Sequence, residues 1–123
     1  MQDNEYFLVF EAKIDRFMKG LKQSLWQAAG LHFRKISTPQ NVISFSAWDR
    51  DIALQLRFVV VGLGSNRALG RLSWLDQQGH DHVCCYVNDD FQCVSRKKNG
   101  LWREQKKPVG EACLRRLQEI KTA

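Results

Sequence analysis

The side chains of this sequence best suited to chemistry gather in one basic run around a tryptophan. Residues 95–123 hold nine Lys or Arg against three Glu, and this excess equals the net charge of +6 of the whole chain. Clustered cations attract phosphates and other anions, and a tryptophan among them can stack on a base or another aromatic ligand. The candidate polyanion-binding residues are Arg96, Lys97, Lys98, Trp102, Arg103, Lys106 and Lys107.

A second interpretation of the same run needs no ligand. Lysines on an edge hairpin discourage sheets from associating edge to edge, and Trp102 would then close the core. No signature of an RNA-recognition motif, a helix-turn-helix or a zinc finger accompanies the run. Two alternatives therefore stay open for region 96–116: a site for nucleic acid or another polyanion, and a solvated hairpin.

Histidines and cysteines form a second group that could bind a metal. In an extended strand, His80, His82 and Cys84 share one face, while Cys85 lies on the other. Zinc needs three or four such ligands that converge on one point. A three-residue turn after this strand would place Cys93 opposite Cys85, on the wrong face to complete the site. The sequence therefore predicts no metal ion, and it contains no motif for another cofactor.

The pair His82 and Cys84 is also the best candidate for nucleophilic catalysis. Two residues apart on a strand, their α-carbons would lie about 6.5–7 Å apart, within reach for activating a thiolate. Cysteines in strands usually pack as inert apolar residues, and the chain has no nucleophile elbow, HExxH motif or P-loop. Paired carboxylates occur only in expected turns, at 49–51 and 89–90. We predict that the protein is not an enzyme, with a cysteine-based activity as the alternative.

Length and composition restrict the class of protein that could position these residues. A chain of 123 residues with 44% apolar residues predicts one α+β domain spanning 1–123. Its longest apolar run, 58–63, is far shorter than the roughly 20 residues of a membrane span. The polar and acidic start at 1–5 is unlike a secretory signal. We therefore expect a cytoplasmic protein that is not bound to a membrane and whose four cysteines are reduced.

The spacing of apolar residues predicts a long helix at the N-terminus and a shorter one at the C-terminus. Steps of three and four residues place one stripe on the first helix, which ends near Gly30 or, at the latest, before Pro39. The last helix begins at Pro108. The first stripe is Phe7, Phe10, Ile14, Phe17, Leu21, Leu25 and Ala28, and the second is Ala112 or Cys113, Leu114, Leu117 and Ile120.

Between the helices, alternating and β-branched segments predict strands joined by short turns. The expected strands are 42–48, 52–61, 69–75, 83–87, 91–96 and 101–103, and the expected turns include 62–66 and a two-residue hairpin at Asn99–Gly100. Such short connections leave no room for parallel crossovers. The predicted fold is a long N-terminal helix packed on a five- or six-stranded antiparallel meander sheet, closed by a C-terminal helix.

The strand over 52–61 is apolar on both faces near its end, at 59–61. Both faces of such a sheet must be covered, either by another chain or by the last helix or the 31–41 segment of the same chain. Because two-fold dimers are the commonest oligomers, we favour a homodimer over a monomer. We expect a small non-catalytic binding or adaptor protein that acts through protein contacts or a cleft between helix and sheet. The alternative is a nucleic-acid-binding module that uses region 96–116.

Overall fold

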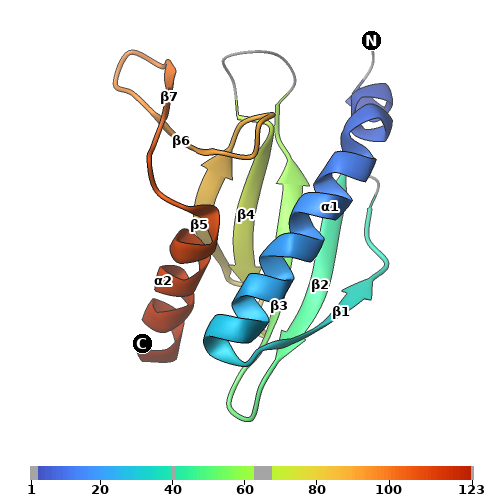
Figure 1. Cartoon of the computed structure of the whole chain (residues 1–123), viewed down its shortest axis with the longest axis vertical. Helices are drawn as coiled ribbons and strands as arrows, with labels where there is room; N and C mark the ends of the chain where they lie inside the picture. The colour runs from blue at the N-terminus through green and yellow to red at the C-terminus, as the bar shows by residue number, and fades with distance from the viewer. Residues whose placement is uncertain (1–2, 40, 63–67, 123) are drawn as a thin grey trace.

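A computed structural model of the chain describes the backbone of residues 3–39, 41–62 and 68–122, and the side chains of these ranges from residue 10 onward. The predicted α+β fold is confirmed, with seven strands instead of five or six. The strands form one antiparallel meander in chain order (Figure 1). The elements are α1 (Asp3–Ala29), β1 (His32–Ile36), β2 (Val42–Trp48), β3 (Ala53–Val60), β4 (Gly70–Leu75), β5 (Asp81–Val87), β6 (Cys93–Arg96), β7 (Trp102–Glu104) and α2 (Val109–Thr122).

The strand absent from the sequence prediction is β1. Gly30 adopts a positive φ of 68° and its amide donates to the carbonyl of Trp26, which ends α1 there. The chain then turns back along β2, with Phe33 paired to Ala47. A strand of sequence HFRKI has two cations and little alternation, which is tolerated because β1 is an edge strand.

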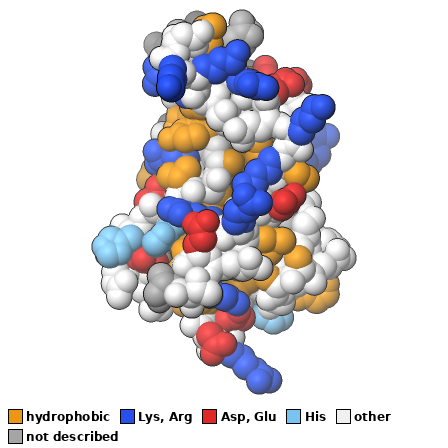
Figure 2. Space-filling view, turned by 90° about the vertical axis from the view of Figure 1, so that its left-hand side faces the viewer, with side chains coloured by type: hydrophobic (Ala, Val, Ile, Leu, Met, Phe, Trp, Pro, Cys, Tyr) orange, Lys and Arg blue, Asp and Glu red, His pale blue; other side chains and the backbone are white. Residues whose placement is uncertain are grey.

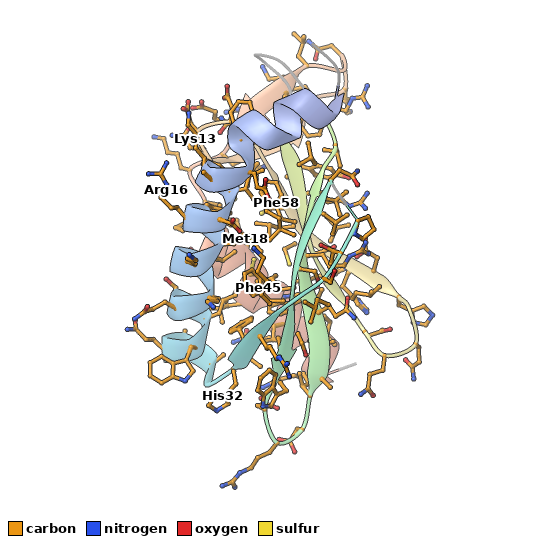
Figure 3. All side chains as sticks on the ribbon, turned by 90° about the vertical axis from the view of Figure 1, so that its right-hand side faces the viewer. Lys13, Arg16, Met18, His32, Phe45 and Phe58 are labelled. Atoms are coloured by element: carbon orange, nitrogen blue, oxygen red, sulfur yellow. The ribbon has the colours of Figure 1, made fainter. Side chains whose placement is uncertain are left out.

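α1 lies diagonally across one face of the sheet and buries its stripe there. Ile14, Met18 and Leu25 are fully buried, and Figure 3 shows Met18 between the helix and the sheet residues Phe45 and Phe58. The predicted stripe is therefore confirmed in its middle and extended by Met18. Ala28 is exposed, so the prediction was wrong at that position, and the side chain of Phe7 lies outside the described residues.

An aromatic cluster closes the same core beside the end of β5. The Phe17 ring stacks on Phe91 at 4.7 Å between centroids and meets Phe58 edge-on at 6.2 Å. Phe91 has a positive φ of 59°, which is uncommon for a bulky residue. This conformation turns the predicted hairpin after β5 so that the ring is directed into the core.

α2 packs on the same face of the sheet as α1. Cys113 and Leu117 belong to the core that α1 closes, and the indole Nε1 of Trp74 donates to the carbonyl of Cys113 at 3.0 Å. In the described part of the chain, neither α2 nor the 31–41 segment covers the opposite face, because β1 has joined the sheet. We refer to this opposite face as the open face.

The hairpin between β6 and β7 differs from its prediction. Arg96 pairs with Trp102, so five residues separate the paired positions instead of the two expected at Asn99–Gly100. Gly100 nevertheless takes the positive φ of 84° for which glycine is suited. The predicted turn at 62–66 lies mostly outside the described residues.

A β-bulge changes which residues of β5 share a face. Leu72 pairs with Cys85 but Ser73 pairs with Val83, which leaves Cys84 as the extra residue. The predicted alternation therefore holds from Cys85 to Val87 but is wrong at His82 and Val83. As a result, His82 and Cys85 lie on the helix-covered face of the sheet.

Candidate anion-binding cleft

A cleft opens where β6 separates from β5. The two strands pair only at Tyr86 with Val94 and at Val87 with Cys93, and β6 then leads away into the hairpin with β7. The space between β5, this hairpin and the first turn of α2 has a volume of about 740 Å³. Both the hairpin and the start of α2 lie on the same side of β5 in Figure 1.

The cleft combines cations with aromatic rings. Arg71 of β4, Arg96 of β6 and Lys107 before α2 line it, and the described lining residues include no carboxylate. The rings of Tyr86 and Trp102 meet across β6 with centroids 5.3 Å apart and a tilt of 49°. A ligand in the cleft would therefore meet positive charge and a flat apolar surface together.

Two of these cations are partly shielded from solvent. Lys107 is half-buried, whereas its neighbour Lys106 is exposed. The guanidinium of Arg71 lies 3.7 Å from the carboxylate of Asp81, and its buried Nε has no hydrogen-bond partner among the described residues. Part of the donor capacity of Arg71 is thus unused.

The structure divides the seven sequence-predicted residues into three groups. Arg96, Trp102 and Lys107 line the cleft. The side chains of Lys97 and Lys98 lie in the exposed hairpin loop. On the other side of the hairpin, Arg103 and Lys106 line a second hollow, which Glu104 and Lys107 also line. Lysine and arginine side chains gather over the top of the molecule, where the hairpin lies (Figure 2).

Sequence reasoning missed Arg71 and Tyr86. Both lie on strands that were predicted, but only the pairing register shows that they face the same way as Val94 and Trp102. The one available signal was a cation inside an otherwise apolar strand at 69–75, which indicates an outward-facing position. Trp102 is half-buried, lies outside the core cluster and lines the cleft, so it does not close the core.

The four cysteines lie near one another beside the cleft, and three of them are held as neutral thiols. Burial and the neighbouring thiols raise the pKa of Cys85, and burial raises the pKa of Cys93. A hydrogen bond with Cys84, followed by burial, raises the pKa of Cys113. Because the thiolate is the reactive form, these three thiols are poor nucleophiles and poor metal ligands near neutral pH.

The sequence candidates His82 and Cys84 have separate hydrogen-bond partners for their imidazole and thiol. Cys84 Sγ donates to the backbone carbonyl of His82 at 3.9 Å, and the His82 imidazole donates from Nε2 to Asp76 at 2.9 Å. This bond, together with the amides of His80 and Gln78, lowers the pKa of Asp76. Among the described residues, no three His, Cys, Asp or Glu side chains are placed to hold a metal ion.

The open face continues from the cleft. The strand register places Arg34, Arg57 and Arg71 on it, and the outward positions of β1–β4 carry no carboxylate. Arg57 lies between Ser44 and Ser73, whose hydroxyls are fully buried and have no hydrogen-bond partner in the described structure. Arg71 belongs to both the open face and the cleft.

Comparisons with known proteins identify no relative: no family model, curated protein or solved structure matches this chain. Within the described residues, neither helix is both long enough and apolar enough to cross a membrane.

Proposed function

We propose that this protein is a non-catalytic binding protein whose cleft takes an anionic ligand that carries a planar ring. The observation that carries the proposal is the lining of the cleft. Three cations and two aromatic rings from five separate segments meet there, without a carboxylate among the described lining residues. We take this cleft, which Ala112 of α2 also lines, as the candidate for the expected binding cleft between helix and sheet.

Each part of the lining suits one part of such a ligand. Guanidinium and ammonium groups bind carboxylate, sulfonate or phosphate oxygens, and Arg71 and Arg96 can each offer two parallel N–H donors. Tyr86 and Trp102 offer two aromatic rings, tilted by 49° with centroids 5.3 Å apart, against which a planar group can pack. The volume of about 740 Å³ lies in the range of small-molecule sites, roughly 300–1,000 Å³.

The chemistry beside the cleft supports binding without turnover. The neighbouring thiols Cys85, Cys93 and Cys113 have raised pKa values and so stay protonated. Free cysteines in this number are compatible with the reducing cytoplasm, where we place the protein.

Nucleic-acid binding through region 96–116 is the second candidate function. It is favoured by the exposed cations Lys97, Lys98, Arg103 and Lys106, which surround a hairpin whose inner side lines the cleft. The two candidates therefore share one site and differ in the length of the ligand.

The arrangement of charge on the open face weakens our expectation of a homodimer through that face. A two-fold interface places the same patch of each copy against the other. Arg34, Arg57 and Arg71 of one copy would then approach those of the second, and like charges across an interface are unfavourable. A negatively charged partner suits this face better than a second copy.

The experiment is a titration with adenosine 5′-monophosphate and with uncharged adenosine, followed by calorimetry and tryptophan fluorescence. We expect the monophosphate to bind more tightly than adenosine and to quench the fluorescence of Trp102. Trp102→Leu and Lys107→Gln should each weaken binding of the monophosphate by about tenfold, which is typical for one lost stacking or charged contact.

Two neighbouring residues provide matched controls. Lys106→Gln removes the same charge as Lys107→Gln but outside the cleft, and Arg103→Gln does the same for Arg96→Gln. Both controls should bind the monophosphate as the unaltered protein does. Equal losses in controls and cleft variants would mean that general charge attracts the ligand, and the proposed site would be wrong.

A further inference from the structure

We propose that the natural ligand is a single-stranded nucleic acid that runs from the cleft diagonally across the open face to Trp48. This inference rests on the proposed function, because one nucleotide of the strand would occupy the cleft. It extends the binding site over a surface to which the sequence assigned no ligand.

The strand register defines the path from the cleft to Trp48, which we call the track. Tyr86 and Arg71 pair across β5 and β4, and Val59 continues their row on β3. One row further along, Arg57 lies between Ser44 and Ser73. Gln55 and Ser46 form the following row, which ends in Arg34 on β1. Trp48 lies beyond this row, with its side chain 40% exposed.

Aromatic pairs lie at both ends of this track. Tyr86 and Trp102 meet at the cleft, and His32 stacks on Trp48 at the far corner with centroids 6.0 Å apart. Stacking of bases on such rings is the usual source of affinity for single strands. In a duplex the base faces are already stacked on one another, so the aromatic pairs favour a single strand.

The length of the track sets the size of the ligand. Val42 of β2 lies in the same row across the sheet as Tyr86, which is three strands away on β5. Trp48 lies six residues further along β2 than Val42. At strand dimensions this amounts to about 20 Å along the strands and about 14 Å across them, or about 25 Å on the diagonal. A strand with about 3.4 Å per nucleotide would cover it with about seven nucleotides, and an extended strand with fewer.

The positive charge of the open face favours a polyanion as its ligand. Arg34 is exposed, Arg57 is half-buried, and among the described residues the only carboxylate paired with an open-face arginine is Asp81, beside Arg71. An acidic peptide would satisfy these charges too, but it has no planar bases for the aromatic pairs. The combination of spaced arginines with terminal aromatic pairs therefore points to nucleic acid.

The experiment measures the anisotropy of fluorescein-labelled oligothymidylates of 2, 4, 7 and 12 nucleotides, with unlabelled adenosine 5′-monophosphate titrated separately. Affinity should rise by at least about tenfold from 2 to 7 nucleotides and then level off, because stacking on the far aromatic pair is reached within the track. The double variant R34Q/R57Q should lose this gain and still bind the monophosphate.

Salt dependence gives a second readout. Each phosphate contact to a single strand contributes about 0.7 to the slope of log affinity against log salt, so R34Q/R57Q should reduce the slope by about 1.4. The control R50Q/R115Q removes two exposed arginines from a turn and from α2, away from the open face, and should leave the slope unchanged. Arg57 is half-buried, so its substitution could disturb folding. R34Q alone avoids this, because Arg34 is exposed, and it should reduce the salt slope by about 0.7.

The outcomes separate the two proposals. The path across the open face would be wrong, and the cleft would stand, in either of two cases. In the first, the protein binds the monophosphate but its affinity does not rise with oligonucleotide length. In the second, the affinity rises with length and R34Q and R34Q/R57Q leave this rise intact. If the unaltered protein does not bind the monophosphate, the proposed function itself would be wrong. Equal affinity for polyglutamate or for a duplex of the same length would show a general attraction to anions, and the assignment to single strands would be wrong.

Discussion

Replacing Gly70 by alanine tests the register on which the site depends. Gly70 begins β4 opposite Val60, on the core side of the sheet, and the ring of Phe58 packs directly over it. A Cβ at Gly70 would lie 2.2 Å from Phe58 Cζ and 2.3 Å from Cε1. The ring would have to move by about 1.2 Å to reach normal contact.

Phe58 has no free space into which it could move. Its side chain is fully buried, and its ring meets Phe17 at 6.2 Å and Phe91 at 6.4 Å between centroids. Overpacking of a closed core typically costs about 1–3 kcal/mol, and the short contact places Gly70→Ala in the upper half of that range, about 2–3 kcal/mol. For a chain of this length the melting temperature should fall by about 6–15 °C.

Thermal unfolding followed by circular dichroism measures this effect, and Gly20→Ala is the matched control. Gly20 lies on the exposed side of α1 and an added Cβ meets nothing within 4 Å, so the same substitution there should stabilise the protein by about 0.5–1 kcal/mol. The double variant with Phe58→Leu should recover at least about 1 kcal/mol relative to additivity. A Gly70→Ala protein that melts within a degree of the unaltered one would refute the β3–β4 register, and with it the placement of Arg57 and Arg71.

Three further predictions concern the core and the titratable groups. Phe17→Ala should lower the free energy of unfolding by about 3 kcal/mol in urea denaturation, because it removes the ring stacked beneath α1; an unchanged midpoint would mean that the helix does not pack through this stripe. Asp76→Asn should flatten the fall in stability below about pH 4, since a carboxyl whose pKa is lowered on folding stabilises the protein above its ordinary pKa and loses that contribution as acid protonates it. An identical acid profile would contradict this. Cys85, Cys93 and Cys113 should react with an aromatic disulfide at pH 8 at least about 100-fold more slowly in native protein than in urea, and a fast native reaction of more than one thiol would contradict the assigned burial.

The elements of the fold could be predicted from sequence because each has a strong local pattern. The α1 stripe repeats over six turns, and the segments that became β2, β3 and β4 are rich in β-branched and aromatic residues. β1 could not be recognised, since its five residues include two cations and follow a long helical pattern. An edge strand needs only one apolar face and few paired groups, so its sequence is weakly constrained.

The site was predictable only in part, because composition identifies cations but register decides which of them meet. Arg96 and Lys107 line the cleft, whereas their neighbours Lys97 and Lys106 do not, although the sequence treats all four alike. One inserted residue reverses the face of everything that follows it in a strand. The bulge at Cys84 does this in β5: it moves His82 onto the face of Cys85, while Tyr86 lies beside Arg71 on the open face.

Divergence of β6 from β5 then converts this row of side chains into a cleft. A fully paired β6 would continue the sheet and leave no space between the strands, but pairing stops after Val94, and the hairpin departs with Arg96 and Trp102. Where the pairing stops, the backbone groups of β5 have no partner on β6, and such an edge can associate with strands of other molecules. α2 lies against β5, and the cations of the hairpin stand over the remaining gap. The same positive charges that discourage association of edges also attract anions, so the two interpretations of the basic run describe one surface.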